Sequence, residues 1–264
     1  MSPVAIRMSM ARVSMDIRTR EETMDSERHQ GGMDSELVQL RLLHLADSAL
    51  PIGGLAHSFG LESLVAEELL GVQELPEFLR GFLEEAGLLE AVFCREGHRL
   101  GSEMNLEEFA RDWLALSERL SAMKPARESR VGSGSLGRNF LSALSGLGDF
   151  AVVREALRIS KASHELIHYS LAFGLGSGAL AFDGSRTVLA FLHSCAASLV
   201  SACQRLLPLG QNAATRILWE LKPTIVETMR RSGACTVDDA SCFMPLLDWG
   251  AMEHPSLATR LFIS

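Results

Sequence analysis

Apolar residues recur every three or four positions along most of the chain, which is the spacing of one face of an α-helix. In the first such segment, Leu37, Leu40 and Leu43 form the apolar side, and Asp34 or Ser35 can cap its start. No run alternates convincingly as a β-strand would. The pattern predicts an all-α, single-domain bundle of about nine or ten helices. The clearest helical segments are residues 34–45, 56–70, 75–100, 105–123, 149–161, 163–182, 186–207, 211–231 and 246–253.

The sequence LADSALPIGGLAHSFGLE, residues 45–62, interrupts this pattern, and we call it the proline–glycine segment. Pro51 fixes its own φ, while Gly53 and Gly54 permit turns that other residues resist. From Ala56 onward the pattern becomes helical again. The segment is therefore expected to present three side chains outward at the start of a helix: His57, Ser58 and Phe59.

Two of the predicted helices contain residues that disfavour a continuous helix. Gly81 and Gly87 could bend or divide the helix over residues 75–100. Pro223 is expected to kink the helix over residues 211–231, because proline removes a backbone hydrogen bond.

Glycines elsewhere suggest two further features. We expect a kink or a flexible turn around Gly132 and Gly134, because glycines and serines weaken the helical pattern there. Gly174 and Gly178 lie four positions apart, a spacing that lets two helix backbones approach closely. Tight internal packing is the plain interpretation of this pair, and a subunit interface is a second use.

Composition and charge narrow the class of protein. Apolar residues make up 47% of the 264, enough for a sizeable core, and aromatics only 6%, which favours close-packed helices. The formal net charge of −8 argues against a nucleic-acid binder and against attraction to anionic lipid. Neither of the most apolar stretches, residues 166–182 and 188–207, offers about twenty uninterrupted apolar residues, so both are predicted to be buried helices rather than membrane spans.

Residues 1–33 lack apolar periodicity, and we predict a disordered N-terminal extension there, followed by an all-helical domain over residues 34–264. Met24 or Met33 could be the translation start. The arginines of the first twenty residues resemble a transit peptide only faintly. The five cysteines form no CxxC pair and no apolar signal peptide precedes them, so reduced thiols in a cytoplasmic protein are expected.

One motif points to an enzyme. On a helix, HELIH at residues 164–168 would place two imidazoles on one face with a glutamate beside them, as in zinc hydrolases. The third ligand is missing, because neither the metzincin histidine nor a glutamate before Trp219 follows. We therefore expect His164 to be exposed and His168 to be a hydrogen-bonded histidine. A zinc hydrolase remains the alternative function.

Three other arrangements resemble sites but lack essential parts. GSGSLGRN at residues 132–139 has neither the lysine nor the final Ser/Thr of a phosphate-binding loop. The adjacent His–Ser pair at residues 57–58 cannot form a serine triad on a helix, because neighbours face different directions. Cys195 and Cys203 share a helical face near His193 and could bind a soft metal, although small thiols lining a core are more common. With no catalytic residue, metal or cofactor predicted, the profile is that of an interaction protein.

Three blocks of sequence carry a resemblance to a known family. They are ALPIGG followed by HSFGLE in the proline–glycine segment, LLPLGQNAATRIL at residues 206–218, and RLFIS at residues 260–264, which we call the terminal segment. Together they resemble the urease accessory protein F (UreF) family in content, order and approximate spacing. The resemblance covers roughly Asp34 to Ser264.

The resemblance implies an all-helical, homodimeric, non-catalytic chaperone of urease maturation. Members of the family bridge the D/H accessory protein (UreD/UreH) and the nickel-carrying GTPase UreG, and the complex engages apo-urease. They are associated with regulating the GTPase so that hydrolysis is coupled to nickel insertion into urease.

The resemblance also assigns partner-binding residues to the three blocks. His57 and Glu62 are expected to be the functional pair, whereas Phe59 and Gly60 could be packing residues. Arg260 is expected to hydrogen-bond back to the proline–glycine segment and order it. The full set is Pro51, Gly53, His57, Ser58, Phe59, Gly60 and Glu62 from the first block, Arg205, Pro208, Gly210 and Gln211 from or beside the second, and Arg260, Leu261 and Phe262 from the third.

Two positions depart from the family pattern. Arg205 stands where relatives have lysine, and a guanidinium does not simply replace a compact ammonium. Leu55 stands where an aromatic residue is often seen, so a tyrosine hydroxyl contact is missing. Both departures leave the detailed contacts of the proline–glycine segment open.

Overall fold

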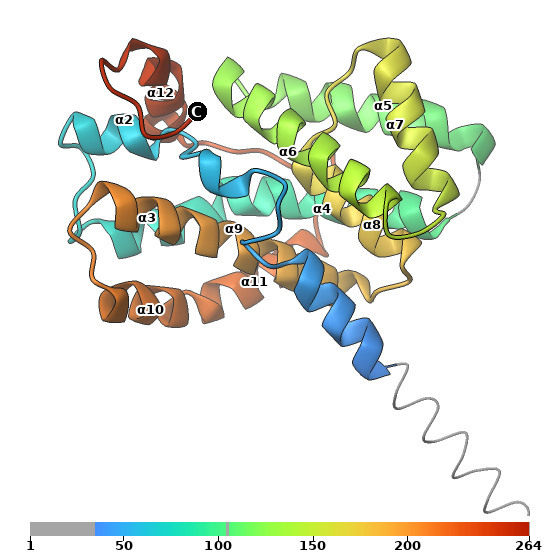
Figure 1. Cartoon of the computed structure of the whole chain (residues 1–264), viewed down its shortest axis with the longest axis horizontal. Helices are drawn as coiled ribbons and strands as arrows, with labels where there is room; N and C mark the ends of the chain where they lie inside the picture. The colour runs from blue at the N-terminus through green and yellow to red at the C-terminus, as the bar shows by residue number, and fades with distance from the viewer. Residues whose placement is uncertain (1–34, 104–105, 264) are drawn as a thin grey trace, which may run out of the picture. The chain divides into compact units, whose positions relative to one another are not determined.

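The computed structural model describes residues 35–103 and 106–263, and the regular structure within them is helical (Figure 1). The predicted all-α fold is confirmed. The predicted disordered extension, residues 1–33, lies outside the described residues. The start of the helical domain at residue 34 stays a prediction.

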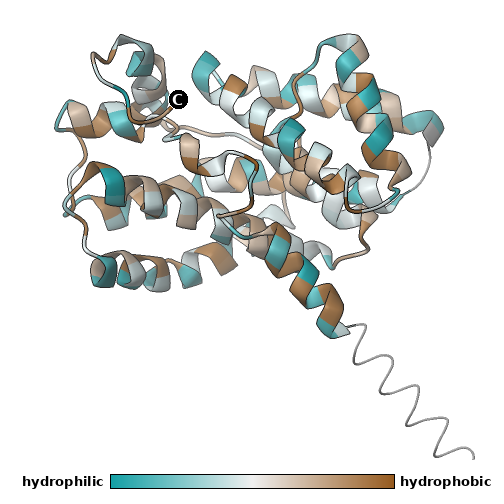
Figure 2. Cartoon of the chain, viewed as in Figure 1, coloured by the Kyte–Doolittle hydropathy of each residue, from teal (hydrophilic) through white to brown (hydrophobic). Residues whose placement is uncertain are grey.

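The chain divides into two compact units, residues 1–44 and 45–264. In the first unit, the described residues 35–44 are helical, where the leucine spacing predicted a helix. Its apolar positions are brown in Figure 2. Leu37, Leu40 and Leu43 are all exposed, so this helix keeps an uncovered apolar face.

The second unit holds the remaining helices, most of which have both apolar and polar positions (Figure 2). The unit contains η1 (Gly54–Ala56), α2 (Leu61–Ala66), α3 (Leu75–Glu84), α4 (Ala86–Ser102), α5 (Leu106–Ala122), α6 (Arg127–Ser145), α7 (Ala151–Ser163), α8 (Tyr169–Ala179), α9 (Gly184–Leu206), α10 (Gln211–Glu220), α11 (Lys222–Ser232), α12 (Pro245–Glu253) and η2 (His254–Ser256).

Two long predicted helices are each divided in two. The first breaks at Glu85, between the two glycines that suggested a bend, because this residue leaves the helical region at φ −107° and ψ −82°. The second breaks at Leu221, and Pro223 lies in the first turn of α11, where a missing N–H costs nothing.

The expectation of a kink or a flexible turn around Gly132 and Gly134 is wrong, because α6 runs through both without interruption. The small residues serve packing instead. A Cβ on Gly134 would press on the Leu166 side chain, and one on Gly137 would clash with the Ile167 carbonyl oxygen. The glycines of α6 therefore allow the connection between α7 and α8 to pack closely against this helix.

The crossing of α4 and α8 is the tightest helix pair of the described chain, and it confirms the internal packing predicted for Gly174 and Gly178. A Cβ on either glycine would clash with a carbonyl oxygen of α4. In return, a Cβ on Gly97 or Gly101 of α4 would clash with a carbonyl oxygen of α8. Four glycines thus bring two backbones together, with no room left for side chains between them.

Helix α9 is the one described helix that is long and apolar enough to cross a membrane by length and composition alone. A core helix meets the same test, and 56% of its apolar window is buried inside the protein. It packs against α4, α8, α10 and α11, which cover that apolar surface. The helix is thus a central element of the second unit.

Replacing Gly174 by alanine tests the α4–α8 crossing. Because the new Cβ would meet the Cys94 carbonyl oxygen, the backbones must separate, and we expect a loss of about 1–3 kcal/mol or more in the free energy of unfolding measured with urea. Gly81→Ala is the matched control. Gly81 lies in α3 with open space where its Cβ would be, so alanine there should add roughly 0.5–1 kcal/mol. Equal effects of the two changes would contradict this account.

Candidate functional site

The proline–glycine segment turns its histidine inward. His57 is 8% exposed and Ser58 is fully buried, and His57 stacks on Phe59 with ring centroids 5.5 Å apart. Burial, together with the nearby His254, lowers the pKa of His57, which favours a neutral imidazole. The expectation that these side chains face outward at a helix start is therefore wrong.

The backbone explains this orientation. Phe59 and Gly60 have positive φ values of 51° and 96°, so the chain makes a left-handed turn and α2 begins only at Leu61, not at Ala56. Gly60 lies directly on α12, because a Cβ there would clash with the Leu247 carbonyl oxygen. Only glycine fits this position, which confirms a packing role for it. The helical spacing of apolar residues extends across this turn, so the sequence alone placed the helix start too early. Packing against α12 imposes the turn.

Glu62 is 5% exposed and forms the centre of a buried hydrogen-bond cluster. Its carboxylate accepts hydrogen bonds from His254 Nε2 at 2.9 Å, from the Leu261 amide at 2.6 Å and from the Phe262 amide at 3.2 Å. A buried carboxylate requires such partners, because an uncompensated charge in the interior is costly. Glu62 therefore holds the terminal segment against α2.

Arg205 makes the second connection to the terminal segment, from the last turn of α9. Its Nη2 donates to the Leu55 carbonyl oxygen at 2.6 Å, and its guanidinium carbon lies 4.0 Å from the centre of the Phe262 ring. The Ile263 amide donates to the Ala56 carbonyl oxygen at 2.8 Å. One arginine thus bridges the proline–glycine segment and the terminal segment by a hydrogen bond and a cation–π contact.

The expected connection exists, but Arg260 does not make it. Arg260 is exposed, and within the described residues it forms no hydrogen bond to the proline–glycine segment. The terminal segment is extended and binds Glu62 and Ala56 through its backbone amides. Its side chains therefore alternate between the interior and the solvent. Phe262 is 5% exposed and faces inward, while Leu261 at 65% and Ile263 at 71% face solvent.

The other residues of the expected partner-binding set lie on the surface. Pro51 and Gly53 are exposed in the proline–glycine segment, and Gly53 takes a left-handed φ of 93°. The remaining three, Pro208, Gly210 and Gln211, are exposed where α9 connects to α10. The structure thus brings Arg205, Glu62 and Phe262 together. His57 and Glu62, expected to act as a pair, share His254 as a neighbour, which hydrogen-bonds to Glu62 and helps to lower the pKa of His57.

Two residues of this site were missed by the sequence reasoning. His254 donates to Glu62, and Asn139 Nδ2 donates to the Ile52 carbonyl oxygen at 2.9 Å, which fixes the proline–glycine segment to α6. Asn139 belongs to the GSGSLGRN sequence, where it stands in place of the Ser/Thr of a phosphate-binding loop. No pattern marks His254, because its partner is 192 residues away.

The HELIH sequence does not lie on one helix. His164 ends α7 with a left-handed φ of 62° and is exposed, whereas His168 precedes α8 and is fully buried. The ring nitrogens of His168 lie 2.8 Å from Ser121 Oγ and 3.2 Å from Ser133 Oγ. The predicted exposed and hydrogen-bonded histidines are confirmed. The geometry on which the zinc-hydrolase alternative depended is absent from this part of the chain.

The cysteines offer no metal site among the described residues, where no group of three His, Cys, Asp or Glu side chains could hold an ion. All five thiols are free. Burial raises the pKa of Cys203 to about 12 and that of Cys195 further, so both remain protonated near neutral pH. His193 is exposed, with the Lys222 ammonium 3.2 Å from its Nδ1, which disfavours a second cation there.

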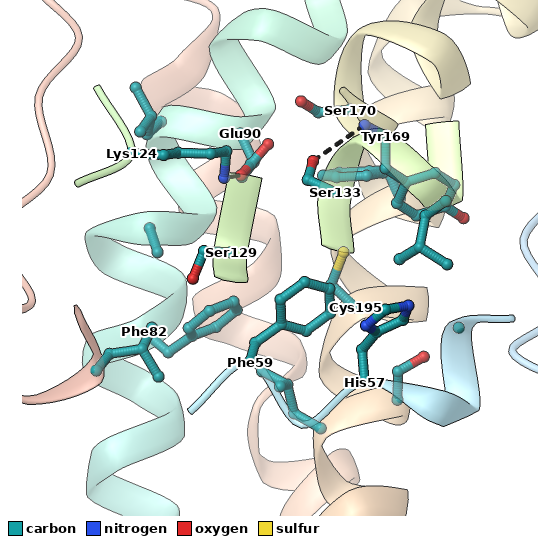
Figure 3. Close-up of a pocket in the computed structure, with 18 of the residues that line it drawn as sticks. His57, Phe59, Phe82, Glu90, Lys124, Ser129, Ser133, Tyr169, Ser170 and Cys195 are labelled. Atoms are coloured by element: carbon teal, nitrogen blue, oxygen red, sulfur yellow. Dashed lines mark hydrogen bonds and ion pairs between the residues drawn. The ribbon is translucent and has the colours of Figure 1, made fainter. Parts of the chain in front are cut away.

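His57 and Phe59 line a cavity of about 190 Å³ inside the second unit (Figure 3). A half-buried ion pair between Glu90 of α4 and Lys124 forms part of the lining. Burial alone would raise the pKa of Glu90, but the Lys124 ammonium keeps it below its ordinary value. The carboxylate is therefore ionised and paired.

Comparison with known proteins gives the same family from a family model and from individual relatives. A model of the UreF family matches residues 71–222. Urease accessory protein UreF of Corynebacterium glutamicum (strain R) is 30% identical over 225 residues, which cover 84% of this chain and 96% of that relative. The protein of the same name in Nostoc sp. (strain PCC 7120) is 31% identical over 229 residues, 85% of this chain and 95% of the relative. A third, from Rhodopseudomonas palustris (strain BisA53), is 29% identical over 226 residues, 85% and 92% of the two chains.

Glu62→Gln tests how the terminal segment is held. The amide keeps the shape but offers a single, uncharged acceptor, so we expect the Leu261 and Phe262 amides to exchange hydrogen about ten times faster, as a loss of roughly 1–2 kcal/mol implies. Native-state hydrogen exchange by NMR measures this directly. The exposed Glu67→Gln is the control and should leave these amides unchanged. Unaltered protection in the Glu62 variant would refute the role given to its carboxylate.

His168 predicts a pH dependence of stability. Its burial, with Lys124 nearby, lowers its pKa from 6.5 to about 4. Between these values the unfolded chain binds the proton and the folded chain does not, so stability is full above pH 6.5 and falls as the pH drops toward 4. The loss should reach roughly 3 kcal/mol in urea unfolding and largely disappear in His168→Gln. His164→Gln, which changes the exposed histidine of the same motif, should follow the unmodified protein.

Proposed function

Because the chain belongs to the UreF family of urease accessory proteins, a non-catalytic chaperone-type family, we propose that it is a scaffold for the assembly that matures urease. It binds the D/H accessory protein (UreD/UreH) and the GTPase UreG, and the assembly engages apo-urease. The partner GTPase supplies the nucleotide chemistry. This chain couples hydrolysis to nickel insertion by contacting the two states of the GTPase differently.

The observation that carries this proposal is the joining of the proline–glycine segment to the terminal segment. The buried Glu62 and Phe262 fix the two backbones, and three apolar side chains are left facing solvent beside them: Leu55, Leu261 and Ile263. A surface whose backbone is already held in place loses little entropy on binding. We therefore assign the D/H partner to this surface.

The wider set of partner contacts belongs to the same proposal. The exposed Pro51, Gly53 and Arg260 border the joined segments, and the exposed Pro208, Gly210 and Gln211 follow Arg205 along the chain. The buried His57, Ser58, Gly60 and Glu62 and the half-buried Phe59 act indirectly, by holding these groups in position. The protein works in the cytoplasm and uses neither nucleic acid nor a membrane. It acts as a homodimer, which light scattering would test.

The double substitution Leu261→Ser and Ile263→Ser tests the assigned surface. Both side chains are mostly exposed, so stability should hardly change, whereas the affinity for the D/H partner should fall about tenfold or more through lost apolar burial. Co-purification and titration with the D/H partner, followed by recruitment of UreG and activation of urease with nickel, provide the measurement.

Leu147→Ser is the matched control, because Leu147 is also 65% exposed but lies after α6, away from the terminal segment. It should bind the partner normally. If the double variant binds as tightly as the control, the terminal segment is not the docking surface, and if neither the original chain nor the variants bind, the scaffold role itself fails.

A further inference from the structure

The cavity that His57 and Phe59 line has no part in the proposed scaffold contacts. It lies between the proline–glycine segment and helices α3, α4, α6, α8, α9 and α12, and the exposed Asp47 among its lining residues marks an opening to solvent. Its volume of about 190 Å³ somewhat exceeds the roughly 150 Å³ of an engineered apolar cavity that accepts benzene. It can therefore hold one substituted aromatic ring, and not a larger cofactor.

One part of the lining is aromatic. In Figure 3 the rings of Phe59 and Phe82 lie toward the bottom of the view, with Tyr169 and the Cys195 thiol toward the right. Because the pKa of His57 is lowered and that of Cys195 is raised, this part of the lining carries no charge near neutral pH. Such walls favour a flat apolar body that can stack or pack edge-on.

The other part is polar and holds the Lys124 ammonium together with the carboxyl groups of Asp47, Glu90 and Asp248. The Lys124 ammonium and the Glu90 carboxylate form an ion pair near the top of Figure 3, and Ser129 also lines the cavity. A carboxylate has about four acceptor positions, so Glu90 can accept a further hydrogen bond without giving up Lys124. An anionic ligand would instead face three carboxyl groups and a single ammonium, which is unfavourable.

We propose that this cavity is a binding site for a small, neutral aromatic molecule that carries one hydrogen-bond donor, of the size of phenol or indole. Its ring packs among Phe59, Phe82 and Tyr169, and its donor reaches the polar part that contains Glu90 and Ser129. Such a pocket, largely apolar with a few convergent polar groups, is the usual form of a small-molecule site. Occupation would brace the inner side of the proline–glycine segment, whose other side holds the terminal segment.

The test titrates the purified full-length chain with phenol and indole, using the shift in the unfolding temperature and calorimetry. We expect a saturable rise in Tm for both, and binding at least about tenfold weaker for benzoate, which carries a negative charge on a ring of similar size. Ser198→Leu fills the cavity from α9 and should abolish binding. Trp219→Ala removes an exposed aromatic side chain outside the cavity lining and should leave binding intact.

A second measurement does not depend on the variants. Crystals of the unaltered protein soaked with 4-bromophenol should show an anomalous bromine peak between Phe82 and Cys195 or elsewhere within the cavity lining. Absence of saturable binding by phenol and indole overturns the proposal. So does binding that survives Ser198→Leu in a folded protein, or that is lost in Trp219→Ala, since either would place the probes on the surface.

Discussion

The close approach of two backbones at the crossing of α4 and α8 determines much of what surrounds it. Gly97, Gly101, Gly174 and Gly178 leave no side chain between the two helices, so their separation and rotation are fixed by carbonyl oxygens rather than by adaptable side chains. Glu90 lies earlier on α4, and His168 and Tyr169 lie where α8 begins. The half-buried ion pair, the histidine network and the cavity all take their positions from this contact.

The same rigidity explains why the proline–glycine segment can be held so far from ordinary backbone geometry. Phe59 and Gly60 both adopt left-handed φ values, and the turn persists because α12 covers Gly60 while Asn139 binds the Ile52 carbonyl oxygen. On the outer side, Arg205 and Glu62 fasten the terminal segment to it. A partner therefore meets a surface that is ordered before binding.

Local sequence patterns predicted the parts of the fold that depend on local physics. The helix after Asn105 and the helix near Leu246 follow their apolar spacing, and the spacing of Gly174 and Gly178 correctly indicated close internal packing. Absence of a third ligand was enough to discount HELIH, and His168 is indeed a hydrogen-bonded core residue. In each case the residue types and their spacing were enough to predict the outcome, although the contacts themselves join distant segments.

The errors concern contacts between distant segments. The helix predicted from Ala56 fails because its start is displaced by α12, almost two hundred residues later. The kink or flexible turn expected around Gly132 and Gly134 fails because α6 packs there on the connection between α7 and α8, with Gly134 against the Leu166 side chain and Gly137 against the Ile167 carbonyl oxygen. Arg205, not Arg260, reaches the proline–glycine segment, and His254 has no sequence pattern that would reveal it. The interior of the site thus depends on tertiary packing that one sequence does not encode locally.

The hydrogen bonds of Glu62 constrain the order in which the protein folds as it is synthesised. Its donors at Leu261 and Phe262 follow it by 199 and 200 residues, and His254 by 192, so a ribosome must add nearly the whole second unit before the carboxylate can be buried with compensation. Until then, α2 cannot adopt its final position without burying the Glu62 carboxylate without its hydrogen-bond partners. Closure around Glu62 is accordingly a late event in folding, because it waits for residues 254–262. The docking surface proposed above would be completed only at that stage.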